Sequence, residues 1–262
     1  MPRSSSSESD GIEFVLVLLD RSKCLPAAAS VPDELKTEIS LHSNASHELK
    51  ESAVHTVGQA CTNLPRVTIA GVIHVDGRSY AMGNLDCLYL GRGAKEIVFQ
   101  SSDIHAPAIF YLLSYPAHAS YPTTLVARDQ ASPVELGSVE SCNRRTVCKY
   151  IYLDGAQSCQ LVMGVTHLHP GSAWNTMPAH THMRRSEIYM YFNLSEQARV
   201  FHLMGPAEET RHIVMKNREA VVSPGWSIHA GVGTEAYSFC WGMGGENQDY
   251  GDMDPAPLNS LL

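Results

Sequence analysis

The stretch Arg66-Val-Thr-Ile-Ala-Gly-Val-Ile-His-Val75, followed at once by Asp76-Gly77, decides the fold class. β-Branched residues recur through the run, and Asp-Gly is a turn that joins two antiparallel strands in a tight hairpin. From here to the C-terminus, short β-prone runs return about every 8–12 residues, with turn residues between them. Long helical periodicity is absent from the sequence. This rhythm predicts an all-β chain built from antiparallel sandwiches or barrels.

The expected strands fall into two sets. The first set comprises residues 66–75, 79–82, 87–90 and 96–100. A linker around residues 116–147, which holds Pro116, Pro122, Pro133 and Gly137, precedes the second set. The second set comprises residues 150–153, 159–166, 187–192, 199–203, 211–215, 219–222 and 237–241. We therefore expect two antiparallel β-barrel (jelly-roll) halves: residues 66–145, linker included, and residues 146–262.

Residues 1–65 form an atypical N-terminal segment. The serine-rich stretch 1–10 is typical of a frayed tail, and a short helix is expected around Asp33 to Ile39. The apolar run Phe14–Leu19 is expected to be a strand or a short core segment, because it follows acidic residues rather than a basic region.

Composition excludes several classes of protein. The formal net charge of −8 provides no general attraction to nucleic acid or to anionic membranes. No apolar run approaches the roughly 18–20 residues of a membrane span, and we expect a cytoplasmic protein. The seven cysteines are odd in number and contain no CxxC pair. This pattern argues against a disulfide framework and against a cysteine zinc site, and it favours free thiols.

A candidate metal site lies in Met177-Pro-Ala-His180-Thr-His182-Met-Arg-Arg-Ser-Glu187. In an extended strand, histidines two residues apart lie on one face, and Glu187 can return to the same pocket from the start of the next strand. His229 follows the turn Pro224-Gly225. Three neutral imidazoles and one carboxylate suit a divalent ion such as zinc, manganese, iron or nickel. We therefore predict one metal site built from His180, His182, Glu187 and His229.

Other histidines offer weaker candidates. His167-Leu-His169 has the same spacing, but no glutamate follows it at a comparable distance, and Pro170-Gly171 would direct its side chains to a barrel rim. His74, His105 and His118 lack nearby partners in the sequence. We interpret them as structural or surface residues.

The glycine, HxH, Glu, Pro-Gly and His pattern of residues 171–229 resembles the two signatures of the cupin superfamily, with more residues between the glycine and the first histidine than is usual. Within it, residues 174–192 resemble the 5-keto-4-deoxyuronate isomerase family. The same resemblance extends over 91–99, 141–147, 199–205, 209–215, 227–233 and 241–248. It covers the chain from about residue 67 to the C-terminus, whereas residues 1–65 fit the family poorly.

The resemblance implies a bicupin in which the C-terminal half alone holds one zinc ion, on the four ligands identified above. It also implies a homo-oligomer, usually a hexamer. The implied reaction interconverts 5-dehydro-4-deoxy-D-glucuronate and 3-deoxy-D-glycero-2,5-hexodiulosonate in the breakdown of pectin-derived uronates. We expect the ion to act as a Lewis acid while a base moves a proton between adjacent carbons.

The substrate carboxylate calls for a cationic clamp, for which arginine is suited. Arg184, Arg185 and Arg211 are the candidates by position, and Glu246, Tyr189 and Tyr191 are candidates for proton transfer or hydrogen bonding. The sequence does not choose the base. Two other functions use the same ligand set or fold: a metal-dependent cupin oxygenase, which would consume oxygen, and a sugar-binding cupin without catalysis.

Overall fold

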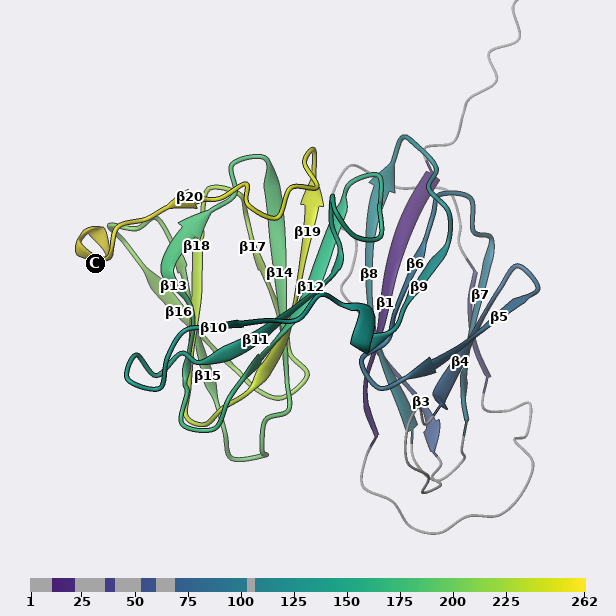
Figure 1. Cartoon of the computed structure of the whole chain (residues 1–262), viewed down its shortest axis with the longest axis horizontal. Coiled ribbons are helices and arrows are strands. Elements are labelled where there is room, and N and C mark those ends of the chain that lie inside the picture. The colour runs from purple at the N-terminus through teal and green to yellow at the C-terminus, as the bar shows by residue number, and fades with distance from the viewer. Residues whose placement is uncertain (1–10, 22–35, 41–52, 60–68, 103–106) are drawn as a thin grey trace, which may run out of the picture.

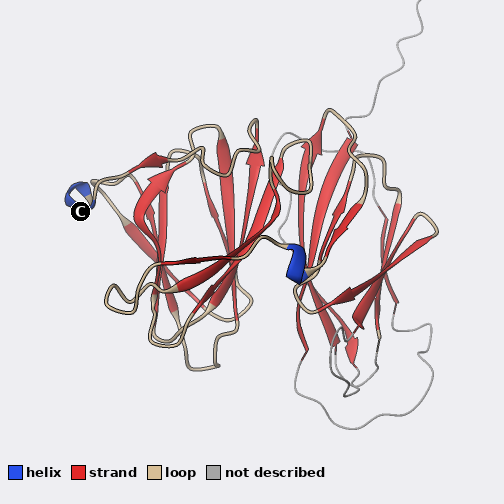
Figure 2. Cartoon of the chain, viewed as in Figure 1, coloured by secondary structure: helices blue, strands red, loops and turns tan. Residues whose placement is uncertain are grey.

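The computed structural model describes residues 11–21, 36–40, 53–59, 69–102 and 107–262, which are almost entirely β-strand and loop (Figure 2). The helices in these residues are two single turns, η2 (Arg128–Gln130) and η3 (Leu258–Ser260). In this part of the chain no helix is long and apolar enough to cross a membrane. The all-β prediction is confirmed, and the strands pair antiparallel throughout their ladders.

The expected helix around Asp33 to Ile39 is wrong where the structure describes it. Residues Lys36–Ser40 form strand β2, which pairs with a neighbouring strand over five residue positions. Residues 33–35 and the serine-rich stretch 1–10 lie outside the described residues. The run Phe14–Leu19 is a strand, as predicted, and forms most of β1 (Gly11–Arg21).

Two antiparallel sheets form the N-terminal part of the molecule (Figure 1). The first has the order β3 (Ala53–Gln59), β8 (Pro107–Ala117), β1, β6 (Cys87–Leu90) and β9 (Thr124–Val126). The second has the order β2, β7 (Glu96–Ser101), β4 (Ile69–Val75) and β5 (Arg78–Gly83).

The hairpin between β4 and β5 is the one expected from the sequence. Asp76 and Gly77 both have positive φ, 46° and 79°, as the two-residue turns that match strand twist require. Val75 and Arg78 pair directly on either side of the turn.

Two further antiparallel sheets form the C-terminal part. One has the order β10 (Val134–Leu136), β11 (Arg145–Ile151), β12 (Leu161–Leu168), β19 (Ser238–Gly245), β14 (Arg185–Phe192) and β17 (Ala220–Ser223). The other has the order β16 (Arg211–Met215), β15 (Val200–Gly205), β18 (Ile228–Gly233), β13 (Trp174–Thr181) and β20 (Asp254–Pro255). The expected linker 116–147 therefore contributes two short strands, β9 and β10.

The four sheets lie as successive layers, and the first sheet of each part faces the other part (Figure 1). Alternation along β1 shows how this is achieved, because successive side chains point to opposite faces. Leu16 and Leu18 pack in the core between the two N-terminal sheets, whereas Val15 and Val17 pack against the C-terminal part. One apolar layer thus joins the two parts.

Strand β1 also connects the two parts through Glu13, whose side chain is fully buried. Its carboxylate accepts hydrogen bonds from the backbone N–H groups of Cys159, Gln160 and Leu161, at 2.7–2.8 Å. It also accepts one from the Tyr89 hydroxyl, at 2.6 Å. The segment 1–65 therefore supplies an interior strand and a polar anchor, while the domain boundaries at residues 65 and 145 stay predictions.

Candidate metal centre

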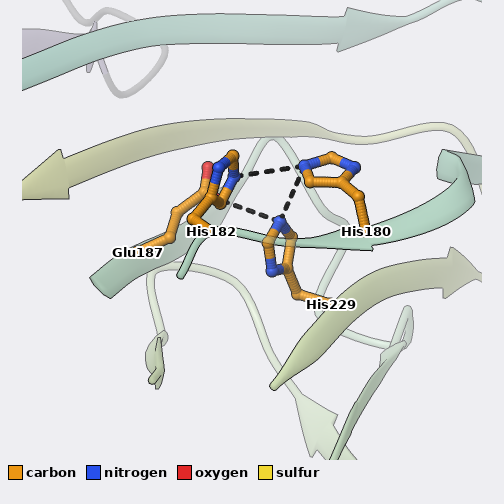
Figure 3. Close-up of side chains that lie close together, drawn as sticks. All are labelled: His180, His182, Glu187 and His229. Atoms are coloured by element: carbon orange, nitrogen blue, oxygen red, sulfur yellow. Dashed lines mark hydrogen bonds and ion pairs between the residues drawn. The ribbon is translucent and has the colours of Figure 1, made fainter. Parts of the chain in front are cut away.

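The four predicted ligands converge inside the C-terminal part (Figure 3). His180 lies in β13 and His182 directly follows it, Glu187 lies in β14, and His229 lies in β18. One ligand atom from each residue can be chosen so that all four lie within 4.8 Å of one another. The geometry that the sequence predicted for this cluster is thus present.

Strand register explains the convergence. His180 and His229 are direct partners across the β13–β18 pair, so their side chains emerge side by side from one sheet. The tight turn after His182 sends the chain into the facing sheet, where Glu187 pairs with Ser223 and Met243. The site therefore spans the interior between two sheets.

The donor atoms are spaced as the ligands of one ion would be. His180 Nε2 lies 3.1 Å from His182 Nε2 and 3.2 Å from His229 Nε2. Glu187 Oε2 lies 3.0 Å from His182 Nε2 and 2.8 Å from His229 Nε2. A tetrahedral zinc ion with bonds of about 2.0–2.1 Å would place its ligands roughly 3.3 Å apart. A divalent cation fits this cluster with small adjustments.

Protonation also favours a cation. Burial, and then the neighbouring His229, lowers the pKa of His180 to about 3, so its imidazole is neutral at neutral pH. Burial opposes the charge of Glu187, but His229 and His182 hold the pKa of its carboxyl well below the usual range. The rings of His182 and His229 are the groups that face the buried Glu187 Oε2, and neither forms a hydrogen bond of good geometry with it. A buried carboxylate is costly without a close partner of positive charge, and a bound cation would provide one.

A second set of contacts orients His182. Its Nδ1 lies 2.9 Å from the carbonyl oxygen of Asp252, to which it donates, so the Nε2 lone pair faces the centre. The guanidinium of Arg185 donates to the same oxygen at 2.8 Å, and to the carbonyl oxygens of Asn247 and Asp249 at 3.0 and 2.7 Å. Arg185 thus holds the C-terminal loop that orients a ligand.

A cavity of about 360 Å³ opens onto the cluster. Cavities that hold small metabolites have volumes of about 300–1,000 Å³. Its wall is mostly apolar and aromatic, with Phe239, Trp241 and Met243 on one sheet and Tyr250 on the C-terminal loop. The cavity suits a small molecule with a polar end. That end would reach His180, His182 and Glu187, while the apolar wall would shield the rest of the molecule from water.

Thr176 and Arg145 are among the polar side chains of this wall that the sequence analysis did not single out. Thr176 lies on an irregular stretch of β13, with φ of 54°, where the pairing with β18 shifts register. Arg145 begins β11. It belongs to the segment 141–147 that carries the family resemblance, which was the one signal that could have drawn attention to it.

Of the candidates for proton transfer, Tyr189 lies in the cavity wall and Tyr191 does not. The Tyr189 hydroxyl lies 2.9 Å from Thr176 Oγ1, and burial raises its pKa well above the usual range. Tyr191 is hydrogen-bonded at 2.7 Å to His202 Nδ1 deeper in the interior. Glu246 is exposed and lies in a separate surface pocket with Arg184. The structure thus brings one of the three to the cluster.

None of the three predicted clamp arginines lines the cavity. Arg184 is exposed and forms a 3.0 Å ion pair with Asp252, and Arg211 is exposed and paired with Glu209. Arg185 is buried, but its guanidinium already donates hydrogen bonds to the main-chain carbonyl oxygens of Asp249 and Asp252. The clamp role stays a prediction for these three, since Arg184 lies in the turn before β14, Arg185 at its first position and Arg211 at the first position of β16, each with partners away from the cavity.

The other histidine pair has partners of its own. His167 Nδ1 lies 2.8 Å from Ser238 Oγ, and His169 Nε2 lies 3.2 Å from Glu135. Neither belongs to a metal-binding group in the described part of the chain. The preference for the His180 pair over this one agrees with the structure.

The N-terminal histidines are also accounted for where the structure describes them. His74 bonds to Ser79 and Gln100, at 2.8 and 2.9 Å. His118 Nδ1 lies 3.5 Å from Cys159 Sγ. His105 lies outside the described residues.

Comparison with known proteins places the chain in a family. Residues 33–256 match the KduI/IolB family. The chain belongs to this family. A relative from Shigella flexneri serotype 5b (strain 8401), named 4-deoxy-L-threo-5-hexosulose-uronate ketol-isomerase, is 56% identical over 192 residues, 73% of this chain and 69% of the relative. A relative of the same name from Escherichia coli O139:H28 matches with the same identity and coverage.

Solved structures confirm the fold. An IolB-like protein from Salmonella typhimurium LT2 superposes with a TM-score of 0.66 at 13% identity, over 95% of this chain and 81% of that one. Oxalate decarboxylase from Lactobacillus farciminis superposes with a TM-score of 0.51 at 9% identity, over 94% and 73%. At these identities the likeness extends to the fold alone.

Proposed function

We propose that this protein is a metal-dependent ketol-isomerase that interconverts 5-dehydro-4-deoxy-D-glucuronate and 3-deoxy-D-glycero-2,5-hexodiulosonate. Membership of the KduI/IolB family and the name of the 56% identical relatives support this reaction. The observation that carries it is the cluster of three imidazoles and one carboxylate, of which His180, His182 and Glu187 line a cavity of about 360 Å³. That volume suits a six-carbon sugar acid.

The reaction is an internal redox exchange. The carbon next to the aldehyde loses a proton, the aldehyde carbon gains one, and the hydroxyl and carbonyl groups exchange places. A bound divalent ion, which we propose to be one zinc per chain, would supply Lewis acidity to the reacting oxygens of the substrate. His180, His182, Glu187 and His229 would hold it, because no other metal-binding group is found in the described residues.

The surrounding residues would bind the substrate, shield it from water and donate a hydrogen bond to it. Phe239, Trp241 and Met243 exclude water from the reacting carbons, which strengthens every polar interaction made there. Tyr189 keeps its proton at neutral pH, since burial raises its pKa. Its hydroxyl, positioned by Thr176, is suited to donate a hydrogen bond to a substrate oxygen.

We further propose a bicupin that assembles as a homo-oligomer, a hexamer by family resemblance, in the cytoplasm. Five described cysteines are free and four of these are buried, which suits a reducing compartment. Light scattering of the purified protein tests the assembly. A mass of six chains is expected, and a monomer at all concentrations would contradict it.

The reaction is tested by incubating the purified, metal-loaded protein with the unsaturated uronate breakdown product and following loss of the 5-keto form by NMR. The matched samples are wild type, His180→Ala/His229→Ala and, as a histidine control, His74→Ala. Turnover is expected in wild type and in His74→Ala, without oxygen uptake at an electrode. Oxygen consumption would instead support a cupin oxygenase, and ligand binding without turnover would support a sugar-binding protein.

A further inference from the structure

Arg145 occupies a particular position in the cavity wall. Its strand, β11, lies between β10 and β12, and Arg145 pairs with Leu136 and Leu168. The strand's alternation determines the direction of its side chains. Arg145 and Val147 line the cavity of the metal centre, whereas Thr146 and Cys148 line a different pocket on the opposite face. Register thus aims Arg145 into the interior.

The guanidinium retains unused donors. Among the described residues its one hydrogen bond is from Nη1 to the carbonyl oxygen of Asn143, at 2.9 Å. No carboxylate of the described residues forms an ion pair with it. Arginine has five N–H donors in a planar fork that matches a carboxylate in two parallel bonds. Arg145 is partly buried, so such a pair would be shielded from solvent.

Among the described residues that line the cavity, Arg145 is the one side chain with a fixed positive charge. Of the described residues that line the cavity, Glu187 is the one carboxylate, and it belongs to the metal ligands. The remaining lining side chains other than the histidines are uncharged. An anionic group that enters this cavity therefore meets one arginine, apart from the metal centre itself.

We propose that Arg145 binds the carboxylate of the sugar acid and so directs the opposite end of the molecule to the metal centre. This inference rests on the proposed function, in which the reacting carbons and the carboxylate lie at opposite ends of a six-carbon chain. Arg145 thereby determines specificity: it selects a uronate over a neutral sugar of the same size. Arg145 of β11 thus takes the role predicted for Arg184, Arg185 or Arg211.

The test compares an anionic ligand with its neutral counterpart. Calorimetry measures binding of 3-deoxy-D-glycero-2,5-hexodiulosonate and of its methyl ester to the metal-loaded wild type, Arg145→Met, Arg145→Lys and the surface control Arg211→Ala. The same four proteins are assayed for turnover of both forms. Metal content and thermal unfolding establish that each variant is folded and loaded.

Loss of a charge-assisted pair is expected to weaken carboxylate binding by about 10- to 100-fold in Arg145→Met. The methyl ester should bind wild type and Arg145→Met equally. Arg145→Lys should recover part of the loss, because lysine keeps the charge and loses the fork. Arg211→Ala should match wild type. An equal loss for acid and ester, or no loss for either, would overturn the proposal.

The binding measurement separates this proposal from the proposed reaction. If wild type binds the acid in an Arg145-dependent manner but turns neither form over, Arg145 is the carboxylate-binding residue and the isomerase assignment fails. If wild type turns over the acid and Arg145→Met does so with unchanged KM, the isomerase assignment stands and the role of Arg145 in carboxylate binding is wrong.

Discussion

The two parts of the molecule share an architecture of two facing antiparallel sheets, but their interiors differ in kind. Between the N-terminal sheets lies a closed set of aliphatic and aromatic side chains, such as Ile73, Phe99 and Phe110. Between the C-terminal sheets lie buried polar groups as well, such as His202 and Glu187. The same arrangement of two sheets can thus enclose either an apolar core or a cavity with buried polar side chains.

The difference follows from what each interior residue can bind. Apolar side chains need contact alone, and they stabilise the N-terminal part through the area that they bury. Buried polar side chains need partners, and the C-terminal interior provides them: Asn175 bonds to Tyr237 at 2.6 Å, and Tyr191 to His202 at 2.7 Å. We infer that the N-terminal part stabilises the fold by packing against the C-terminal part, which contains the candidate site.

Removing the ligand carboxylate should have the largest effect. Glu187→Gln removes the one carboxylate of the proposed ligand set, whose charge would balance a bound cation, so turnover should fall by about 10²- to 10³-fold, with loss of bound metal. Turnover and mass spectrometry of bound metal measure this. His74→Gln, the matched change in the N-terminal part, should alter neither, and retention of metal by Glu187→Gln would contradict the assignment.

Opening a hole in the N-terminal core should cost stability and leave the chemistry intact. Phe110 is fully buried and packs against Phe99, with 5.2 Å between ring centroids. Phe110→Ala should lower the free energy of unfolding by about 3–5 kcal/mol. Phe201→Ala, at an exposed position, should cost less than about 1 kcal/mol.

Urea unfolding monitored by tryptophan fluorescence measures both changes. The turnover number per folded molecule of Phe110→Ala should stay near that of wild type. A fall in turnover as large as that of Glu187→Gln would show that the N-terminal core takes part in the chemistry.

The connection between the parts should be intermediate in effect. Glu13→Gln replaces one acceptor oxygen by an NH₂ group that faces backbone donors of Cys159 to Leu161. We expect a loss of about 2–3 kcal/mol in the free energy of unfolding. Glu96→Gln, at an exposed position of β7, provides the control and should change it by less than about 0.5 kcal/mol. Equal stability of the two variants would argue against the anchor.

The smallest expected effect is on how the free energy of unfolding changes with pH. Burial lowers the pKa of His202 from 6.5 to about 4, so this side chain takes up a proton on unfolding between those values. Its contribution to stability is present above pH 6.5 and is lost as the pH falls towards 4. Metal-free His202→Gln should therefore lose less stability than metal-free wild type between pH 7 and 4.5. Parallel losses in urea unfolding would contradict this.

Much of the site could be predicted from the sequence because its signals are local. The HxH spacing places His180 and His182 on one face in any extended strand, and the short link to Glu187 limits where that carboxylate can go. The hairpin at Asp76-Gly77 follows from the positive φ that both positions need.

The remainder depended on contacts between distant segments. Arg145 enters the cavity because β11 pairs with β10 and β12 in one register, and a slip by one residue would turn it to the other face. Arg185 is two residues from Glu187, yet it binds the loop of residues 247–252, some 60 positions further along the chain. Neither relation is encoded in spacing.

Titration of zinc into the chelated protein, with turnover followed by NMR, tests whether one ion held by the C-terminal part supports isomerisation. Activity should rise linearly to one equivalent per chain and then stay constant, with no activity in His180→Ala/His229→Ala. Full turnover in the chelated protein, or a rise that continues to two equivalents, would contradict it.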